Sequence, residues 1–543
     1  HRDLHSFPTR RSSDLFIDLR DRTGLVQVVF NPQEDHETHE KSHDVRSEYV
    51  LAVKGRVRER PGDMINPKLK TGKVEVFINH LRVLNTSKTP PFMIEDYIDV
   101  TESVRLKNRY LDLRRPGIQK NLVLRHQAAQ IARDFLNRNG FLEIETPFLT
   151  KSTPEGARDY LVPSRVNQGD FYALPQSPQL FKQLLMISGL DRYYQLARCF
   201  RDEDLRADRQ PEFTQIDLEM SFIREEDIMN LMEEFMVELF KKTLDLDVPR
   251  PFPRLTYDQA MERYGLDRPD IRFGLELVDV TEIVAGSGFK LFSQAAASGG
   301  VIKAVNAKGA GHFSRKQLDD MVEYAKIYGA KGLAWIKINH DGWQSPIAKF
   351  FTDDEKNRLI QTLGLEVGDA VFFSADERKV VREVLGQLRI KLAKDLNLIP
   401  ADEFRFCWVT LFPMFEYSAE EKRLNAMHHP FTSPVEEDLE RLETAPESVK
   451  ARAYDLVLNG SEIGGGSIRI HRPDVQERVF KALGIGQAEA EDKFGFLIEA
   501  LAYGAPPHGG LAFGFDRLVM ILAGCSSIRD RSEERRVGKE GRD

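Results

Sequence analysis

The sequence has few cysteines, no long apolar run and no excess of positive charge. Its three cysteines, Cys199, Cys407 and Cys525, are too far apart for a paired metal-ligand motif, and this usage is typical of reduced thiols in a cytoplasm. No apolar run approaches the roughly 20 residues that span a bilayer. The net charge of −8 excludes a generally basic coat for nucleic acid, although RNA binding requires only a local basic footprint. We therefore expect a cytoplasmic protein outside the membrane.

With 543 residues the chain exceeds a single hydrophobic core, so several domains are expected. Residues 1–15 and 531–543 show neither strand nor helix periodicity and resemble translated adapter sequence. We expect them to be non-native-looking tails on a chain truncated at both ends. The predicted units between them are a β-rich domain (16–85), a linker (86–105), two parts of one α+β domain (106–275 and 406–530) and an inserted α+β domain (276–405).

The β-rich domain is predicted from alternating apolar residues and from one turn. The segment Asp21–Gly24 separates two apolar runs and is a hairpin signal, and Val74, Val76 and Ile78 alternate in a later run. A small all-β barrel follows from this pattern, with an oligonucleotide-binding (OB) fold as the leading candidate. The predicted strands are 16–19, 25–30, 49–57 and 73–84.

A helical period replaces this alternation after the linker. Apolar residues between Leu124 and Phe135 recur at every third or fourth position, which predicts a helix over 119–139 that stops at Gly140. The run that follows, 141–146, predicts a strand that Pro147 ends.

The most constraining segment is the stretch CFRDEDLRADRQPEFTQID, residues 199–217. A charged loop between two strand-like runs predicts a hairpin whose base aims Arg201 and several carboxylates into one cavity. A planar guanidinium can hold a phosphate through two parallel hydrogen bonds. A solvated surface loop is the alternative, and the apolar flanks of the segment argue against it.

Three segments together resemble the motifs of class II aminoacyl-tRNA synthetases, and of the bacterial-type aspartyl enzymes in particular. The helix, strand and Pro147 resemble motif 1, residues 199–217 resemble motif 2, and GGLAFGFDR (509–517) resembles motif 3. The resemblance covers residues 16–530. It implies a multidomain α+β protein with an OB-fold anticodon-binding domain, an antiparallel-sheet catalytic domain and an inserted domain of the type shared with an amidotransferase subunit (GAD-type).

The resemblance also implies that a homodimer activates L-aspartate with ATP and Mg²⁺ and transfers it to the 3′ end of tRNA(Asp). Carboxylate attack on the α-phosphate depends on positioning and charge neutralisation. Arg201 is expected to bridge the substrate carboxylate and the α-phosphate, and Arg517 to meet the γ-phosphate. Glu203 is expected to read the adenine amino group, with a structural salt bridge as the alternative. The expected ATP-binding residues are Arg201, Asp202, Glu203, Gln210, Glu462, Gly514, Phe515, Asp516 and Arg517.

For aspartate, the family match assigns Arg469 to the side-chain carboxylate, a role that suits a bidentate guanidinium. Glu155 and Asp217 are expected to bind the substrate ammonium, and Lys182 to add a second cation. The pair 428–429 resembles the family's mobile histidines and suits a switch near working pH, although a core histidine is the alternative for each. The expected aspartate-binding residues are Glu155, Ser177, Gln179, Lys182, Arg201, Asp217, His428, His429 and Arg469.

Two further pairs are expected to bind metal and RNA. Asp455 and Glu462 can hold Mg²⁺ shared with ATP phosphates, since Mg²⁺ takes few protein oxygens; a β-hairpin with ordinary surface acids is the alternative. Phe16 and Gln27 match the family's anticodon readers, because phenylalanine can stack a splayed base and glutamine can hydrogen-bond its edge. The alternative for Phe16 is the barrel core.

Two other functions stay open. One is a non-discriminating enzyme that charges both tRNA(Asp) and tRNA(Asn), and the other is a tRNA-binding paralogue without catalysis. Arg469 with Lys182 favours a negatively charged substrate side chain over asparagine or lysine. The paralogue is disfavoured because the residues expected to hold phosphate and metal are intact: Arg201, Glu203, Asp455, Glu462 and Arg517.

Overall fold

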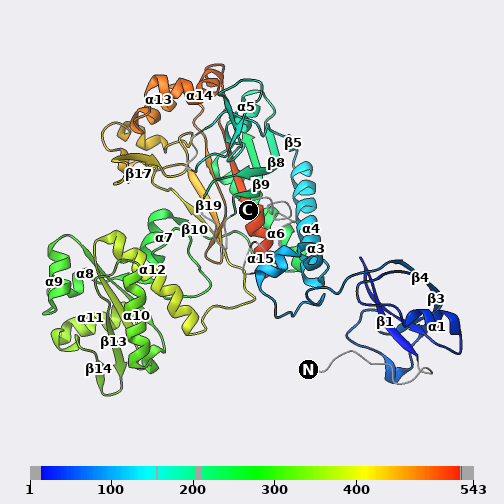
Figure 1. Cartoon of the computed structure of the whole chain (residues 1–543). Coiled ribbons are helices and arrows are strands. Elements are labelled where there is room, and N and C mark those ends of the chain that lie inside the picture. The colour runs from blue at the N-terminus through cyan, green and yellow to red at the C-terminus, as the bar shows by residue number, and fades with distance from the viewer. Residues whose placement is uncertain (1–13, 154–156, 204–209, 526–527, 529–543) are drawn as a thin grey trace. The chain divides into compact units, whose positions relative to one another are not determined.

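The computed structural model describes residues 14–153, 157–203, 210–525 and 528 (Figure 1). The chain falls into two compact units that divide between Gln119 and Lys120. Within the described ranges, no helix combines the length and the apolar character that crossing a membrane requires.

The first unit is built on a four-stranded sheet in the order β1-β2-β4-β3, and all four predicted strands are present. β2 and β4 pair in parallel and the other neighbours are antiparallel. Oδ1 of Asp21 closes the β1–β2 turn by accepting hydrogen bonds from the amides of Thr23 (2.7 Å) and Gly24 (3.1 Å). The elements are β1 (Leu15–Asp21), β2 (Gly24–Phe30), α1 (His36–Ser42), β3 (Val50–Glu59), η1 (Gly62–Met64), β4 (Val74–Asn85), α2 (Glu102–Lys107) and α3 (Arg109–Asp112).

The second unit is built on an eight-stranded sheet in the order β10-β16-β19-β20-β21-β9-β8-β5. Its neighbours are antiparallel except for β10–β16 and β5–β8, which pair in parallel at the two edges. The predicted hairpin over residues 199–217 is confirmed as β8 and β9. The strands are β5 (Leu142–Glu143), β8 (Arg192–Phe200), β9 (Glu212–Ser221), β10 (Arg254–Thr256), β16 (Phe406–Thr410), β19 (Ala453–Leu458), β20 (Ser461–Ile468) and β21 (His508–Gly514).

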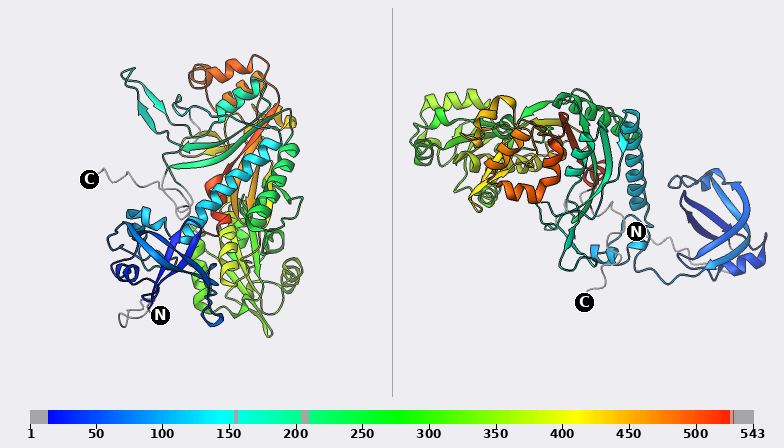
Figure 2. Two further views of the ribbon diagram at one scale, coloured as in Figure 1. Left: turned by 90° about the vertical axis from the view of Figure 1, so that its right-hand side faces the viewer. Right: turned by 90° about the horizontal axis from the view of Figure 1, so that it is seen from above.

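Helices α4, α6 and α15 cover one face of this sheet, and their apolar side chains share a single core with it (Figure 2). Helices α5, α7, α13 and α14 pack in two other cores of the unit. The helix predicted over 119–139 is confirmed as α4. The bounds are α4 (Pro116–Arg138), α5 (Gln179–Ile187), α6 (Glu225–Leu244), α7 (Tyr257–Tyr264), α13 (Pro473–Ala482), α14 (Gln487–Leu501) and α15 (Phe515–Leu522), with short elements β6 (Leu161–Pro163), β7 (Phe171–Ala173), β17 (Phe415–Ser418), β18 (Arg423–Ala426), η4 (Glu436–Arg441) and η5 (Pro446–Ser448).

The strand predicted over 141–146 is much shorter than expected. β5 comprises only Leu142 and Glu143, and the amide of Ile144 adds one more hydrogen bond to the carbonyl of Tyr194 (3.1 Å). β5 lies at the edge of the sheet and pairs with β8 on one side only. With one neighbour to pair with, the apolar run does not continue as a strand to Pro147.

Residues 277–395 form an antiparallel five-stranded sheet in the order β11-β12-β15-β13-β14, with helices on both faces (Figure 1). Helices α10 and α12 share one core with the sheet, and α8, α9 and α11 share another. The bounds are β11 (Leu277–Asp279), α8 (Thr281–Val284), α9 (Lys290–Ala297), β12 (Val301–Ala307), η2 (Ala310–His312), α10 (Arg315–Ile327), β13 (Ala334–Asn339), β14 (Gly342–Gln344), η3 (Ala348–Phe350), α11 (Asp353–Leu363), β15 (Ala370–Asp376) and α12 (Arg378–Asp395).

Glu262 on α7 joins this five-stranded region to the rest of the second unit. Its carboxylate pairs with Lys303 of β12 and with Arg378 and Arg382 of α12. The side chain of Lys303 is buried, and its ammonium also donates to the carbonyl oxygen of Glu262 (2.8 Å). Burial raises the pKa of Glu262, but the hydrogen bonds from the three cations outweigh it and hold that pKa at about 2.

We expect Glu262→Gln to lower the free energy of unfolding by about 2–3 kcal/mol, measured by urea denaturation. The loss is smaller than for a fully buried pair because Glu262 keeps part of its side chain in solvent. Glu276→Gln, which breaks the surface pair with Arg263, should change stability by less than about 0.5 kcal/mol. Because the pKa of Glu262 is depressed from 4.5, the difference between wild type and Glu262→Gln should be full above pH 4.5 and fade toward pH 2. A difference that is constant with pH would contradict this role.

Candidate active site

The face of the eight-stranded sheet opposite α4, α6 and α15 carries buried polar side chains. Polar and apolar residues can be separated in this way because successive side chains of a strand point to opposite faces. In β9, Ile216 and Leu218 enter the core beneath α6 and α15, so Asp217 and Glu219 point to the opposite face. In β19, Tyr454 enters that core while the next residue, Asp455, lines a cavity on the other face. The period-2 pattern of these strands therefore collects carboxylates on one side of the sheet.

That face holds a cavity of about 530 Å³. Most residues that the sequence predicts for ATP, aspartate and metal come together in its wall, although they derive from segments more than 300 residues apart. The predicted residues that line it are Ser177, Gln179, Lys182, Arg201, Glu203, Gln210, Asp217, His428, His429, Asp455, Glu462, Arg469, Gly514, Asp516 and Arg517.

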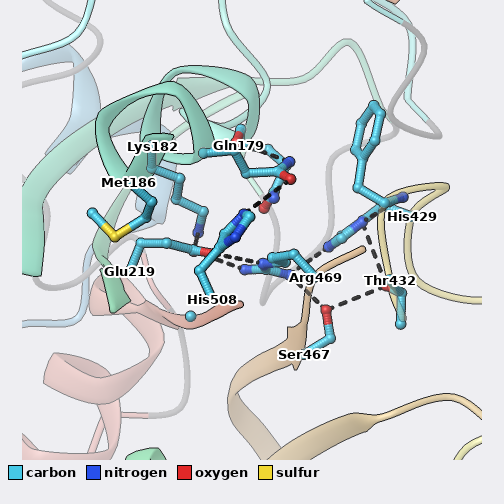
Figure 3. Close-up of polar contacts among 12 residues, drawn as sticks. Gln179, Lys182, Met186, Glu219, His429, Thr432, Ser467, Arg469 and His508 are labelled. Carbon is cyan, nitrogen blue, oxygen red and sulfur yellow. Dashed lines mark hydrogen bonds and ion pairs between the residues drawn. The ribbon is translucent and has the colours of Figure 1, made fainter. Parts of the chain in front are cut away.

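One end of the cavity contains two cations, Lys182 and Arg469, that are both held by the buried carboxylate of Glu219 (Figure 3). A second buried carboxylate, Asp217, also pairs with Lys182. The ammonium of Lys182 lies 2.8 Å from Asp217 and 3.3 Å from Glu219. The guanidinium of Arg469 donates twice to Glu219, at 2.8 and 3.1 Å. It also donates to Oγ of Ser467 at 2.6 Å. Since all four charges balance, this end of the cavity presents fixed cations without a net charge to desolvate.

The local environment shifts the pKa values of the buried carboxylates and of His429 in different directions. Burial raises the pKa of Asp217 to about 6, against the effect of Lys182. Burial acts on Glu219 in the same direction, but the charges of Arg469 and Lys182 outweigh it and lower the pKa of Glu219 to about 2. Burial and the charge of Arg469 hold the pKa of His429 well below 6.5. A neutral His429 fits the hydrogen bond that Nη1 of Arg469 donates to its Nε2 (2.6 Å).

Asp455 and Glu462 face each other across the β19–β20 hairpin, where the register shifts between Leu456 and Val457. A Cβ on Gly465 would lie 2.5 Å from Oδ1 of Asp455 and 3.5 Å from Oε1 of Glu462, so glycine is required for both carboxylates to occupy this space. The charge of Asp455 is the main cause that raises the pKa of Glu462 to about 7. These are cavity residues rather than ordinary surface acids.

The β8–β9 hairpin supplies the other wall. The guanidinium of Arg201 lies 5.0 Å from the ring centre of Phe213, and its Nε is buried without a hydrogen-bond partner among the residues described. Glu203 and Gln210 line the cavity on either side of residues 204–209, which lie outside the described part of the chain. At the opposite strand, Nη1 of Arg517 donates to the carbonyl of Glu462 (2.6 Å).

Two predicted residues are placed differently, and a third lies outside the described part of the chain. The side chain of Phe515 is 2% exposed in the core beneath the sheet, since it follows the strand on the apolar side of α15, and does not line the cavity. Asp202 is exposed outside the cavity and accepts a hydrogen bond from Tyr160, because it alternates with Arg201 and Glu203 along the strand end. Glu155 lies outside the described residues.

Asp516 lines the cavity, but its carboxylate is already hydrogen-bonded to other residues of the protein. Its carboxylate accepts hydrogen bonds from Arg125 (2.8 Å) and from the amide of Thr214 (2.7 Å). Gly510, in the segment 509–517, has a steric role that the sequence did not indicate. A Cβ on Gly510 would lie 1.9 Å from Oε2 of Glu219, so this glycine leaves room for the buried carboxylate that holds the two cations.

In the first unit, Phe16 and Gln27 lie on the same face of the β1–β2 ribbon. Phe16 pairs with Val29 and Asp18 pairs with Gln27, so Phe16 and Gln27 are diagonal neighbours. The opposite face of this ribbon packs on the core of the unit. Phe16 is 50% exposed, and the barrel-core alternative for it is wrong.

Sequence reasoning missed several residues that line the cavity or hold its lining side chains from behind. Glu219 could have been found from its spacing, because it follows Asp217 by two positions in a strand and must share its face. Ser467 stands in the same relation to Arg469. Phe213 lies in β9 four positions before Asp217, so it shares the face of Asp217 and could have been found in the same way. Asp267 lines the cavity from the segment after α7, and no periodic signal marks it.

Comparisons with known proteins agree with this architecture. Residues 101–532 match the family of class II tRNA synthetases (D, K and N), and residues 5–84 match the family of OB-fold nucleic acid binding domains. The chain is 63% identical over 517 residues to the aspartate–tRNA(Asp/Asn) ligase of Desulfatibacillum aliphaticivorans, covering 95% of this chain and 87% of that protein. It is 59% identical over 517 residues to the protein of the same name from Geobacillus sp. (strain WCH70), with the same coverage.

Solved structures show the same fold at low sequence identity. The asparaginyl-tRNA synthetase of Pyrococcus horikoshii, complexed with asparaginyl-adenylate, is 18% identical with a TM-score of 0.59, covering 96% of this chain and 91% of that one. The asparaginyl-tRNA synthetase of Entamoeba histolytica is 20% identical with a TM-score of 0.59, covering 97% and 91%. The multidomain α+β fold with an OB-fold unit is thereby confirmed.

Proposed function

The chain belongs to the class II tRNA synthetases of the D, K and N type, and we propose that it activates L-aspartate with ATP and charges both tRNA(Asp) and tRNA(Asn). The curated relatives compared above are all named aspartate–tRNA(Asp/Asn) ligases. The non-discriminating alternative therefore replaces the expectation of an enzyme specific for tRNA(Asp). Such an enzyme would work in the cytoplasm, where tRNA is used for translation.

The main observation in favour of aspartate as the substrate is the pair of cations, Lys182 and Arg469, at one end of the cavity. Lys182 and Arg469 are both buried and both held by Glu219, so their positions are fixed before substrate arrives. A second carboxylate on the amino acid can accept hydrogen bonds from both. Asp217 at the same end can bind the ammonium group. A neutral amide side chain would leave part of this donor set unpaired.

The remaining wall suits ATP. Arg201 carries its charge beside the aspartate end, where it can bind the α-phosphate and the attacking carboxylate together. The ring of Phe213 offers a stacking surface for adenine, and Glu203 a hydrogen-bond acceptor for its amino group. The carboxylate oxygen of aspartate forms a bond to the α-phosphorus, and pyrophosphate leaves toward Arg517. The 3′ end of tRNA then attacks the aspartyl carbonyl and AMP leaves.

The carboxylate pair fits Mg²⁺. Oδ1 of Asp455 is buried, with Nε2 of His428 at 3.6 Å as its neighbouring donor, and Glu462 lies across Gly465 from it. Mg²⁺ binds through one or two carboxylates plus substrate phosphates, so Asp455 and Glu462 would hold it beside ATP. When bound, the ion would neutralise charge on the phosphate oxygens.

The raised pKa of Asp217 predicts how aspartate binding depends on pH. The substrate ammonium requires the ionised carboxylate, whose pKa burial raises to about 6. We expect affinity for aspartate to be constant above this pH and to fall about tenfold per pH unit below it, measured by calorimetry between pH 5 and 8. Asp217→Asn should bind weakly throughout and lose this slope. Wild-type binding that stays constant down to pH 5 would contradict the assignment.

The first unit is proposed to bind the anticodon through the exposed face of β1 and β2. Phe16 offers a ring for stacking an unpaired base, and Gln27 offers an amide for reading a base edge. The match to OB-fold nucleic acid binding domains supports this use of the sheet.

We also propose a homodimer that forms along α4 and β5. β5 is an edge strand of the large sheet, and Leu142 on it is 50% exposed. Val123 on α4 is 54% exposed, although most apolar residues of that helix are buried. An unpaired edge strand beside exposed apolar side chains is a surface that soluble proteins cover.

Charging assays with purified tRNA(Asp) and tRNA(Asn) test the proposal directly. We expect aspartate to be attached to both tRNAs, with kcat/KM values within about tenfold of each other. Attachment of aspartate to tRNA(Asp) alone would overturn the non-discriminating assignment and leave aspartate activation intact.

A further inference from the structure

Helix α1 of the first unit carries a cluster of metal-ligand side chains. α1 packs against β4 and β2, and His39, Glu40 and His43 lie at its C-terminal end. Because a helix advances about 100° per residue, these three positions fall within one face. Their potential ligand atoms all lie within 4.8 Å of one another. The rings of His39 and His43 are nearly perpendicular, at 88°, with centres 4.8 Å apart.

The cluster is buried at one end: His39 is buried, His43 is half-buried and Glu40 is exposed. His39 is 1% exposed, and Nε2 of His43 is buried without a hydrogen-bond partner among the residues described. A buried polar nitrogen left without a partner is destabilising, and such groups in native proteins call for an unobserved partner such as an ion. The position also favours positive charge, because the C-terminal end of a helix is the negative end of its dipole.

We propose that His39, Glu40 and His43 bind a divalent transition-metal ion of the Zn²⁺ type. Two imidazole nitrogens and one carboxylate oxygen form a ligand set that zinc accepts, with water in the fourth position. Ligand atoms around one tetrahedral zinc ion lie about 3.4 Å apart, so the site closes through side-chain shifts of about 1 Å. The exposed side chain of Glu40 is free to rotate into such an arrangement.

The residues His39 to His43 also spell the pattern H-E-x-x-H, which places two histidines on one side of a zinc-binding helix. In that pattern the glutamate acts as a base and a third ligand comes from elsewhere. Here the carboxylate of Glu40 lies close enough to both rings to be the third ligand itself. With Glu40 as a ligand, no glutamate remains to act as a base. We therefore propose a structural metal site that stabilises α1 and not a hydrolytic centre.

The test is a Zn²⁺ titration of the full chain, made without a histidine tag. Asp455→Asn is introduced into every protein, so that the active-site carboxylates do not compete. His43→Ala is expected to weaken Zn²⁺ binding about a hundredfold, because one of three protein ligands is lost. The matched control is His36→Ala, which removes an exposed histidine of the same helix outside the cluster and should leave affinity unchanged.

Two further measurements keep the result decisive. Glu40→Gln alters only an exposed side chain and should weaken Zn²⁺ binding about tenfold, even if His43→Ala fails to fold. Bound Co²⁺ should show the intense visible absorption of a tetrahedral ion in the His36→Ala protein. Equal Zn²⁺ affinity in His43→Ala, Glu40→Gln and His36→Ala proteins would overturn the proposal, as would a Co²⁺ spectrum without tetrahedral bands.

Discussion

An Arg469→Ala variant is expected to lose about 10²–10³-fold in kcat/KM for aspartate in pyrophosphate exchange, while KM for ATP changes less than about threefold. The guanidinium is buried and donates two hydrogen bonds to Glu219 and one to Ser467. Alanine removes the proposed partner of the substrate side chain and also leaves Glu219 with Lys182 alone. Both effects act at the aspartate end of the cavity.

Arg469→Lys separates charge from geometry, because lysine keeps the charge and loses the planar fork. It should recover only part of the loss. Arg472→Ala is the matched control, since this exposed arginine three residues later pairs with Asp474 at the surface. Equal losses for aspartate and ATP in Arg469→Ala would show that Arg469 does not read the amino-acid side chain.

Arg201→Ala is expected to reduce the rate of pyrophosphate exchange about 10²–10³-fold at saturating aspartate and ATP. Its guanidinium is held over Phe213, and its buried Nε has no hydrogen-bond partner within the described residues. Because Arg201 also lines the cavity, its guanidinium is well placed for charge that develops on the α-phosphate. Removing it should therefore slow the chemical step more than it weakens substrate binding.

Arg198→Ala provides the control for this variant. Arg198 lies on β8, three residues before Arg201, and pairs with Glu212 (3.1 Å) outside the cavity, so its loss should leave exchange nearly unchanged. A Phe213→Leu protein tests the stacking surface separately and should raise KM for ATP. If Arg201→Ala raised only KM values and left kcat intact, the proposed role at the transition state would be wrong.

The site could be predicted where strand periodicity and motif spacing acted together. The roles of Arg201, Asp217 and Arg469 followed from the resemblance to the family's motifs, and all three side chains line the cavity. Phe515 was misplaced because a motif gives neighbours in sequence, whereas the first turn of α15 sends this ring to the core. Asp202 lies outside the cavity for a different reason, because its side chain alternates with those of Arg201 and Glu203.

Long-range pairing set the features that sequence could not provide. Glu219 pairs with Lys182 of α5 and with Arg469, which follows β20. No local sequence pattern predicts these two contacts. Gly510 is a glycine because Glu219 occupies the space of its side chain, which is a contact between strands. The shortness of β5 likewise follows from its place at the sheet edge.

The most direct test of aspartate activation is pyrophosphate exchange by the full chain with aspartate, asparagine and lysine in turn. It requires no tRNA and so depends only on the cavity of the second unit. Aspartate should support exchange with kcat/KM at least about 10²-fold above asparagine and lysine, because Lys182 and Arg469 are fixed for a carboxylate. Exchange with asparagine or lysine that equals or exceeds exchange with aspartate would contradict the assignment.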